Sequence, residues 1–536
     1  MASNVKITVQ EINQTAPRGA GASADVVYVP GLVIYDGDGF ESTKNEPVLC
    51  QDIATFRRHF GDRPYEFQTS DFQDANGDSV YEDIKNAHKV DPSYVYASEL
   101  IRAGLPVYYE AIVPDGSTTT AEISTALAAL NIAKSAYEAA QASVTESKAA
   151  YDAAASAYAA DNSDENGRAA YEASIVYESA KEALATATST YNQAQQTYED
   201  AVNQATSRLH YFMVTVKERI AALTDKGEYT GKYITTGGYP SVTIGTDGVG
   251  VDIATTMLSV ANERQDAVAL LDHTDIRTIK LGVGVEDSLY DKLNDALKTI
   301  SHSEFGAMFT PWALYNCGNT LSDVVGTKDV NESQVYLPAS FGYLMCLAKA
   351  IKTSPNWLAM AGVTRGMVPN LVSLAPNERL NNNIAEDYQP KFGDNENNKI
   401  SINAITNIKP YGYCIWGNRT LYPVDPKGTT ALNFLNTRNM ISDIKKLAYT
   451  TAKSLMFEQD SNILWLKFKS GVSPLLDRLV GGYGIKEYKI IKGDTKADGT
   501  ALTRGEIAAT IRIYPLYANE YFEITVIIAD DDVKVS

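Results

Sequence analysis

The sequence predicts a multidomain α/β (α+β) protein, with a discontinuous α/β core, an inserted antiparallel helical hairpin and a β-strand near each end of the chain. Strand-like and helix-like segments alternate along 23–116 and again along 231–410, as they do in α/β cores. Residues 121–200 contain 25 alanines and one glycine, which favours long helices. Short runs of alternating apolar residues mark the two terminal strands.

These patterns divide the 536 residues into consecutive segments, and a chain of this length is long enough for several domains. We predict an N-terminal β arm with its linker (1–22), the first part of the core (23–116), the inserted acidic hairpin (117–230), the second part of the core (231–410), a C-terminal domain (411–520) and a C-terminal β arm (521–536). The core is therefore interrupted in sequence by the hairpin.

The two arms are predicted from alternation with a period of two. Val5, Ile7 and Val9 share one face of the first strand, and a linker with Pro17, Gly19 and Gly21 follows. Near the other end, the same spacing places three apolar side chains on one face: Ile524, Val526 and Ile528. The acidic run at 530–532 that comes next discourages further sheet stacking.

The helices and strands of the core are predicted from short apolar runs and from the residues that end them. Gly104 stops one predicted helix, and a buried strand begins directly afterwards. We predict strands at 26–31, 47–50, 106–113, 233–234, 267–272 and 307–312, and helices at 53–61, 98–103, 253–264, 288–300 and 338–351.

The hairpin is predicted from two series of seven-residue steps separated by 161–167. The tyrosines on these steps are Tyr137, Tyr151, Tyr158, Tyr177, Tyr191 and Tyr198. Alanines from 173 to 201 form a parallel series, so we expect large residues to face small ones in an antiparallel coiled coil. A first helix of about 40 residues would extend roughly 60 Å. Twelve acidic and four basic residues within 121–200 give −8, and we expect the hairpin to project into solvent. We favour packing of these tyrosines inside the hairpin over an exposed face that binds a partner.

Composition excludes some classes of function. The 47 Lys/Arg and 66 Asp/Glu residues give a net charge of −19, which disfavours direct contact with nucleic acid phosphates or anionic lipid. No uninterrupted apolar stretch is long enough to cross a bilayer, and the start lacks the pattern of a signal peptide, so we expect folding in a cytoplasm without membrane insertion. Four scattered cysteines, Cys50, Cys317, Cys346 and Cys414, are predicted to be buried free thiols.

Catalytic, cofactor and metal sites are not predicted. Asp272-His273 follows a strand, which is a common place for catalytic groups, but there is no Gly-x-Ser-x-Gly elbow and we favour a polar loop role for His273. Gly282-Val283-Gly284 lacks the other residues of a phosphate-binding loop. Residues 71–82 have the length of a calcium loop, but Ala75 occupies a ligand position.

The C-terminal third carries the most specific motif. Trp416, Gly417, Asn418, Arg419 and Thr420 precede a stretch with Arg438 and then Phe457-Glu458, an order that resembles the signature of contractile tail sheath proteins of bacteriophages and related injection machines. Further islands follow that family's order: Val29-Pro30-Gly31, Glu46-Pro47-Val48-Leu49, Arg264-x-Asp266, Pro338-Ala339-Ser340, Ile402-Asn403-Ala404-Ile405 and Ile513-Tyr514-Pro515. The hairpin at 117–230 is not part of the common pattern.

The resemblance implies a subtilisin-like sheath core, a C-terminal sheath domain and a mechanical role in the virion. It implies six subunits per ring, a helical stack of rings around a tail tube protein, and baseplate and tail terminator proteins as further partners. The terminal strands would be exchanged between subunits, with Gly19 and Gly21 as hinges, and contraction would drive the tube through the host envelope for genome ejection.

Other functions remain open from the sequence. The chain could serve a domesticated, phage-derived injection device, or be a surface-layer or adhesin subunit that attaches through its acidic coiled coil. A hydrolase on the α/β core would depend on His273. Hollow cylinders formed by the purified protein would favour a sheath, and small closed oligomers would favour an enzyme.

Overall fold

The computed structural model describes residues 25–32, 46–72, 89–112, 120–205, 208–225, 229–242, 253–273, 303–318, 333–352, 354–374, 401–423, 429–459, 462–495, 499–503 and 506–518. Both predicted terminal strands lie outside these ranges, with Val5, Ile7, Val9, Ile524, Val526 and Ile528, and so does the helix predicted at 288–300. Contacts divide the chain into two compact units, one comprising 1–67, 83–113 and 215–536, the other 68–82 and 114–214.

The first unit contains an eight-stranded mixed sheet. Its strands in spatial order are β11 (Gly412–Ile415), β10 (Ile402–Ile408), β6 (Gly306–Thr310), β5 (Val268–Asp272), β4 (Tyr233–Ile234), β1 (Val27–Leu32), β3 (Val107–Ile112) and β2 (Pro47–Cys50). The inner strands run parallel, whereas β2 and β11 at the edges are antiparallel to their neighbours. Every residue of β1, β5 and β6 is buried, because helices and loops cover both faces of a parallel sheet. The mixed α/β fold is thus confirmed.

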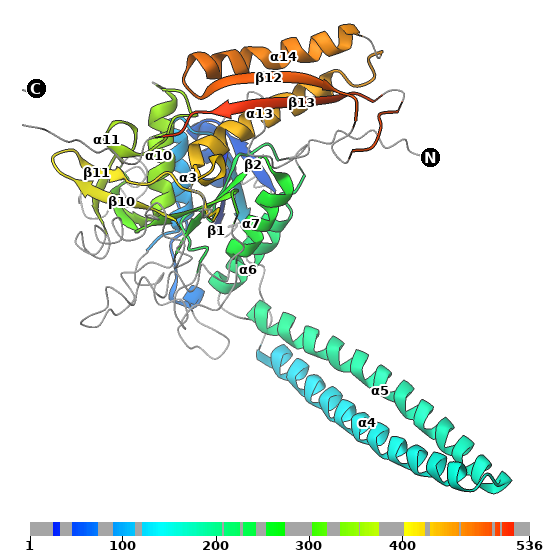
Figure 1. Ribbon diagram of the computed structural model, residues 1–536. Helices are drawn as coiled ribbons and strands as arrows, with labels where there is room; N and C mark the ends of the chain where they lie inside the picture. Colours follow the sequence, from blue (N-terminus) through cyan, green and yellow to red (C-terminus); the bar gives the residue numbers. More distant parts are fainter. Residues whose placement is uncertain are drawn as a thin grey trace, which may run out of the picture. The chain divides into compact units, whose positions relative to one another are not determined.

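Helices pack around this sheet (Figure 1). They are α1 (Ile53–Phe60), α3 (Pro92–Ala103), α7 (Ile253–Arg264), α10 (Ala339–Ile351) and the short α11 (Gly362–Arg365). The side chain of Asp91 caps the start of α3, and Gly104 ends it in the left-handed conformation at φ 97°, which confirms the predicted stop. A small antiparallel sheet of β8 (Gln334–Leu337), β7 (Ala313–Asn316) and β9 (Leu371–Leu374) lies in the same unit.

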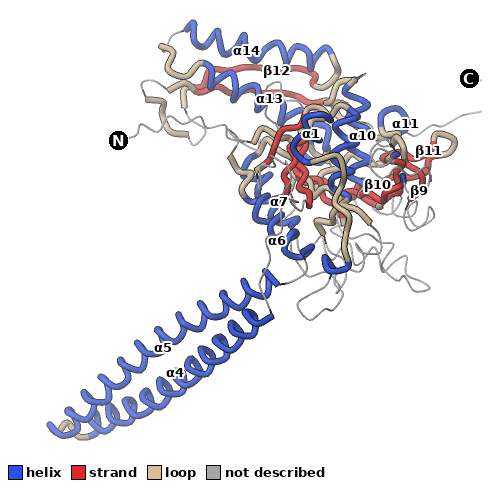
Figure 2. Tube along the Cα trace, turned by 180° about the vertical axis from the view of Figure 1, so that it is seen from behind, coloured by secondary structure: helices blue, strands red, loops and turns tan. Residues whose placement is uncertain are grey.

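The C-terminal part of this unit is a layer of two helices on a two-stranded antiparallel sheet (Figures 1 and 2). The helices are α13 (Leu435–Ser454) and α14 (Asn462–Gly481), and the strands are β12 (Ile485–Gly493) and β13 (Ala508–Pro515). Ile444, Leu476, Ile485 and Ile513 belong to one buried apolar cluster between helices and sheet. Only one face of the β12–β13 sheet is covered in this way.

The second unit contains two long helices, α4 (Thr120–Ala160) and α5 (Asp164–Ala205), joined by residues 161–163. They lie side by side and antiparallel in both views (Figures 1 and 2). After α5 the chain forms α6 (Arg208–Ala221), which ends in the first unit.

The four cysteines are buried free thiols, as predicted. Burial raises the pKa of Cys50 and of Cys346 to about 12, so these thiols stay protonated at neutral pH. In the described part of the chain, no helix is apolar enough over sufficient length to span a membrane.

Candidate functional site

The signature segment leaves the edge strand β11 and crosses to the start of α13. The Trp416 backbone N–H donates to the Ala404 carbonyl at 2.6 Å, and Arg419 forms an isolated antiparallel bridge with Phe434, directly before α13. The side chains of Asn418, Arg419 and Thr420 are buried, whereas Trp416 is 41% exposed. The segment therefore joins the eight-stranded sheet to the C-terminal layer.

Asn403 on β10 holds this segment in place. Its Oδ1 accepts from the Arg419 N–H at 2.7 Å, and its Nδ2 donates to the Arg419 carbonyl at 2.8 Å and to the Met308 carbonyl on β6 at 3.1 Å. Gly417 passes so close that a Cβ there would lie 2.9 Å from the Asn403 Cα. A side chain at 417 is therefore excluded without a backbone shift.

A second pair of amides connects the segment with α13. Asn418 Nδ2 donates to Asn436 Oδ1 at 2.7 Å, and the Asn436 N–H donates to Asn418 Oδ1 at 3.2 Å. Asn436 also donates to the Trp357 carbonyl at 3.0 Å, and Thr420 Oγ1 donates to the Leu432 carbonyl at 2.6 Å. Both amides are buried and use their donors and acceptors, so they specify one arrangement of sheet and helix.

Buried arginines reinforce this junction. The Arg419 guanidinium lies 4.8 Å from the centre of the Phe434 ring. Arg438, the next arginine of the predicted signature, is fully buried on α13, pairs with Glu304 and lies 4.5 Å from the Phe305 ring centre. Burial lowers the pKa of Arg438, an effect that the Glu304 carboxylate opposes.

A buried ion cluster forms another connection to α13. Lys232 Nζ, which is inaccessible to solvent, lies 2.8 Å from Asp25 Oδ1 and 2.8 Å from Asp443 Oδ1. Asn356 Nδ2 donates to the remaining oxygens of both carboxylates, at 3.1 and 2.9 Å. Asp25 precedes β1, Lys232 precedes β4 and Asp443 lies on α13, so one lysine ties three distant segments together. Burial lowers the pKa of the adjacent Lys446 to about 8.

The hairpin helices bury the positions that the seven-residue steps predict. On α4, all the less exposed positions from 126 to 151 fall on these steps, with Ala133 and Ser147 buried. Tyr137 stacks on Tyr191 with ring centres 5.5 Å apart, and Tyr151 stacks on Tyr177 at 5.9 Å. The tyrosines thus meet each other in pairs rather than facing alanines, because the antiparallel alignment brings tyrosine steps of the two helices into the same layers.

The two remaining tyrosines differ. Tyr198 is half-buried on α5, and Tyr158, 42% exposed, lies near the connection between the helices. A Cβ on Gly167, the one glycine within 121–200, would lie 3.0 Å from the Tyr158 ring.

The hydrolase alternative does not match the geometry around His273. This residue is buried at the end of β5, not in a polar loop, and its Nε2 lies 2.6 Å from Thr310 Oγ1. Asp272 Oδ1 accepts from the Ser340 backbone N–H at 3.0 Å, and the Ser340 hydroxyl is 3.0 Å from the Tyr96 hydroxyl. These buried contacts connect the sheet with α10 and expose no nucleophile.

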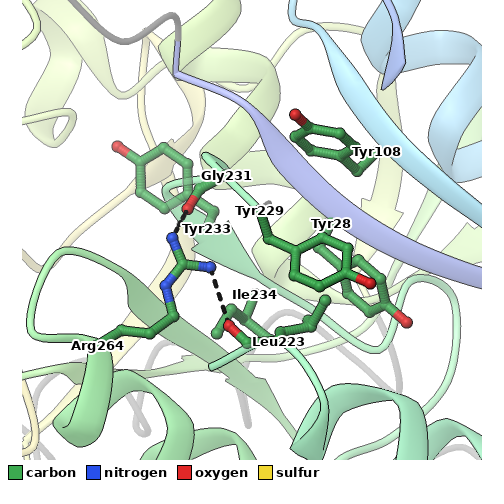
Figure 3. A pocket seen from close by; sticks show the side chains of 8 residues that line it. All are labelled: Tyr28, Tyr108, Leu223, Tyr229, Gly231, Tyr233, Ile234 and Arg264. Carbon is green, nitrogen blue, oxygen red and sulfur yellow. Dashed lines mark hydrogen bonds between the residues drawn. The ribbon is translucent and has the colours of Figure 1, made fainter. Parts of the chain in front are cut away.

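The cavity in Figure 3 encloses only about 10 Å³, close to the space of one water molecule. Arg264 lines it and donates to the carbonyls of Leu223 and Gly231 at 3.3 and 2.8 Å (Figure 3). Among the described residues, no group of three or more His, Cys, Asp or Glu side chains is placed to hold a metal ion. The segment 71–82, which has the length of a calcium loop, lies mostly outside the described ranges.

Known proteins point to the same family as the signature. The chain is 21% identical over 202 residues to the tail sheath protein of Vibrio phage KVP40, a match that covers 38% of this chain and 28% of that protein. It is 22% identical over 272 residues to the tail sheath protein of Enterobacteria phage T4, covering 50% of this chain and 38% of that protein. The resemblance to contractile tail sheath proteins is confirmed.

The matches thus span 28% and 38% of the lengths of these tail sheath proteins. No family model matches the chain. Among solved structures, it resembles the contracted sheath complex of the extracellular contractile injection system PVC, with a TM-score of 0.47, 11% identity and 98% of both chains covered. The anti-feeding prophage baseplate gives a TM-score of 0.46 with 12% identity, covering 99% of this chain and 100% of that one.

The tail sheath motif identifies the signature residues but not the side chains that hold them. Asn403 carried a signal, since it is a polar residue inside an apolar strand, and Asn436 follows directly after the start of α13. No sequence pattern points to the Lys232 cluster, because its members are separated by about two hundred residues in the chain.

Asp272 makes the stability of the fold depend on pH. Burial raises the pKa of Asp272 to about 7, against about 3.9 in an unfolded chain. The folded state therefore holds the proton of Asp272 more tightly than the unfolded chain does. The stability that this proton contributes is fully present below about pH 4 and is lost as the pH rises through 7. Because of Asp272, the free energy of unfolding of the wild type should fall by an amount on the order of 3 kcal/mol between pH 4 and pH 8. We expect this fall to be absent in Asp272→Asn, which keeps the acceptor for Ser340.

Urea unfolding of the wild type and Asp272→Asn at several pH values measures this. Asp91, whose pKa burial raises to about 6, contributes its own slope in both proteins. Asp62→Asn, at a carboxylate that is 80% exposed, is the matched control and should keep the wild-type profile. An unchanged pH profile in Asp272→Asn would show that this carboxyl is not the group responsible.

Proposed function

We propose that this chain is the structural subunit of a contractile tail sheath, and not an enzyme. In this role it polymerises as stacked hexameric rings around a tail tube and contracts to drive the tube through the host envelope for genome ejection. The observation that carries the proposal is the similarity to two phage tail sheath proteins, together with the signature segment 416–420, in which Asn418, Arg419 and Thr420 are buried.

The β12–β13 sheet supports subunit linkage by strand exchange. It is two-stranded in the described part of the chain, so each strand has one hydrogen-bonding edge without a strand partner there. Such an edge accepts a strand from another chain. In the proposed sheath, the terminal strands with Val5, Ile7 and Val9 and with Ile524, Val526 and Ile528 add to sheets of neighbouring subunits. Subunits then rotate during contraction while staying tethered.

The junction described above supports a rigid subunit within this flexible lattice. Asn403, Asn436 and Lys232 fix the C-terminal layer to the eight-stranded sheet through buried polar contacts. When rigid subunits are joined by flexible terminal strands, a change in the contacts between subunits can move each subunit by a large distance. The energy for contraction is then stored as weaker contacts in the extended lattice, and no nucleotide is required.

The α4–α5 hairpin is an insertion that the proposed sheath places on its outer surface as an antiparallel coiled coil. Stacked tyrosine pairs and buried alanines form the contacts between its two helices, so the hairpin does not require packing against the core to be stable. Tube and ring contacts require only the inner domains, and extra mass is tolerated most easily outside. A map of the assembled sheath with the hairpin against the tube would rule this placement out.

The partners follow from the same role. They are further copies of the chain, a tail tube protein, and baseplate and tail terminator proteins, with no direct contact to nucleic acid and no membrane insertion. The protein would be made in the host cytoplasm and reside in the contractile tail of the virion.

Negative-stain microscopy of the purified full chain tests the function. Hollow cylinders are expected; monomers or small closed oligomers under all conditions, including added tube protein, would contradict a sheath.

Deleting residues 1–16 tests the arm. We expect a folded monomer with an unchanged circular dichroism spectrum and melting curve that no longer forms cylinders, because the donated strand is gone while the core is intact. Sedimentation velocity measures the loss. A matched control replaces 1–16 by a scrambled sequence of the same composition, and normal cylinders from the deletion variant would refute strand exchange at this end.

A further inference from the structure

The open face of the β12–β13 sheet carries an unusual set of side chains. The opposite face packs on α13 and α14, with Ile485 and Ile513 each 1% exposed. On the open face, the register pairs Lys489 with Arg512, and the neighbouring position pairs Ile491 with Thr510. All four side chains are exposed, and Ile491 is 42% exposed.

Lys489 and Arg512 are like charges at directly opposed positions, an arrangement that destabilises an antiparallel pair. Within the described residues neither makes an ion pair, and the carboxylate of this face, Glu487, stands opposite Tyr514. Tyr514 is 41% exposed. Two unfavourably placed cations beside two exposed apolar side chains form a surface that fits an acidic partner with apolar groups of its own.

The chain itself contains a segment with the charge of such a partner, because its basic and acidic residues are unevenly distributed along the sequence. Residues 435–518, which include this face, contain 13 Lys/Arg and 8 Asp/Glu, a balance of +5, although the whole chain carries −19. The hairpin segment 121–200 carries −8, from twelve acidic and four basic residues. Two hairpins therefore repel each other, whereas a hairpin and the C-terminal sheet attract.

The hairpin also has exposed apolar residues. Tyr171 is 68% exposed, Ile175 52% and Val176 60%, all within about one turn and a half of α5. Acidic residues occur on the same helix before and after them, at Glu165 and Glu182. Because the rest of the helix surface is mostly alanine and polar, this group matches Ile491 and Tyr514 in size and chemistry.

We propose that the open face of the β12–β13 sheet in one copy binds the acidic α4–α5 hairpin of a second copy. The contact joins two different surfaces, so it propagates along an open helical assembly instead of closing into a dimer. It rests on the proposed sheath function and gives the hairpin a role in the lattice. Salt weakens the contact, because opposite charges are screened.

Lys489→Glu separates this role from a structural one. In the monomer, the new carboxylate faces Arg512 and replaces a repulsive pair by an attractive pair, so the thermal midpoint should rise. Between copies, the same change puts a negative charge against the acidic hairpin, so the critical concentration for assembly should rise about tenfold or more. Light scattering and thermal unfolding measure the two effects. Lys469→Glu on α14, an exposed lysine with the same change in charge, is the matched control and should assemble as the wild type does.

Disulfide trapping identifies the occupant. Full-length Ile491→Cys and Val176→Cys variants are mixed and oxidised during assembly, with the four native cysteines buried and protected. A heterodimer of the two variants is expected, and neither variant mixed with wild type should give it. If the wild type forms cylinders but Lys489→Glu assembles normally, or no heterodimer forms, this contact is refuted while the sheath function stands. If the wild type forms no cylinders with tube protein, the sheath function itself fails.

Discussion

Replacing Lys232 with methionine is expected to lower the free energy of unfolding by about 3–5 kcal/mol, because it leaves buried carboxylates without their cation. Lys232 lies 2.8 Å from both Asp25 and Asp443 and is inaccessible to solvent. Burial already raises the pKa of Asp443, and loss of the lysine would raise it further. Urea denaturation at pH 7 measures the change.

Two controls separate the charge effect from packing. The triple variant Lys232→Met, Asp25→Asn, Asp443→Asn removes the unpaired charges and should recover most of the loss, since neutral buried groups can replace a buried ion cluster at little cost. Lys453→Met, at an exposed lysine in the last turn of α13, should change stability by no more than about 0.5 kcal/mol. A Lys232→Met protein as stable as the wild type would mean that the cluster contributes nothing.

The second large effect is expected for Asn403→Leu. The leucine fills a similar volume but leaves the Arg419 N–H, the Arg419 carbonyl and the Met308 carbonyl without their amide partner. Each buried polar group left unsatisfied costs about 1–3 kcal/mol, so we expect a loss of about 3 kcal/mol or more. Limited proteolysis should also cut the segment after β11 faster, because Asn403 holds it against the sheet.

Asn407→Leu is the matched control on the same strand. Asn407 is half-buried, near the end of β10, so its replacement should cost under about 1 kcal/mol. If the two variants lose equal stability, the amide of Asn403 has no special role in holding the signature segment. Asn403→Asp keeps the acceptor for the Arg419 N–H but places a buried carboxylate against the Arg419 and Met308 carbonyls, so it should lose at least as much stability as Asn403→Leu.

The local elements of the core could be predicted because they depend on short-range patterns. The stop of α3 at Gly104 needs only a residue that adopts a positive φ, and the buried strands β1, β5 and β6 read as continuous apolar runs. The hairpin steps likewise identified which positions of α4 are protected from solvent. The sequence did not reveal that tyrosines pair with tyrosines, because spacing along one helix does not fix the alignment of the other.

The sequence by itself determined the element types, the family resemblance and the positions of the signature residues, since all of these are encoded within a few turns or strands of chain. Only the tertiary structure decided what the signature does: Asn403 and Asn436, from β10 and α13, hold Asn418 and Arg419 in a buried junction. The same is true of Lys232, whose two carboxylates, Asp25 and Asp443, lie about two hundred residues before and after it in the chain. Contacts between distant residues depend on how strands are ordered and helices are packed, and no local pattern specifies that order.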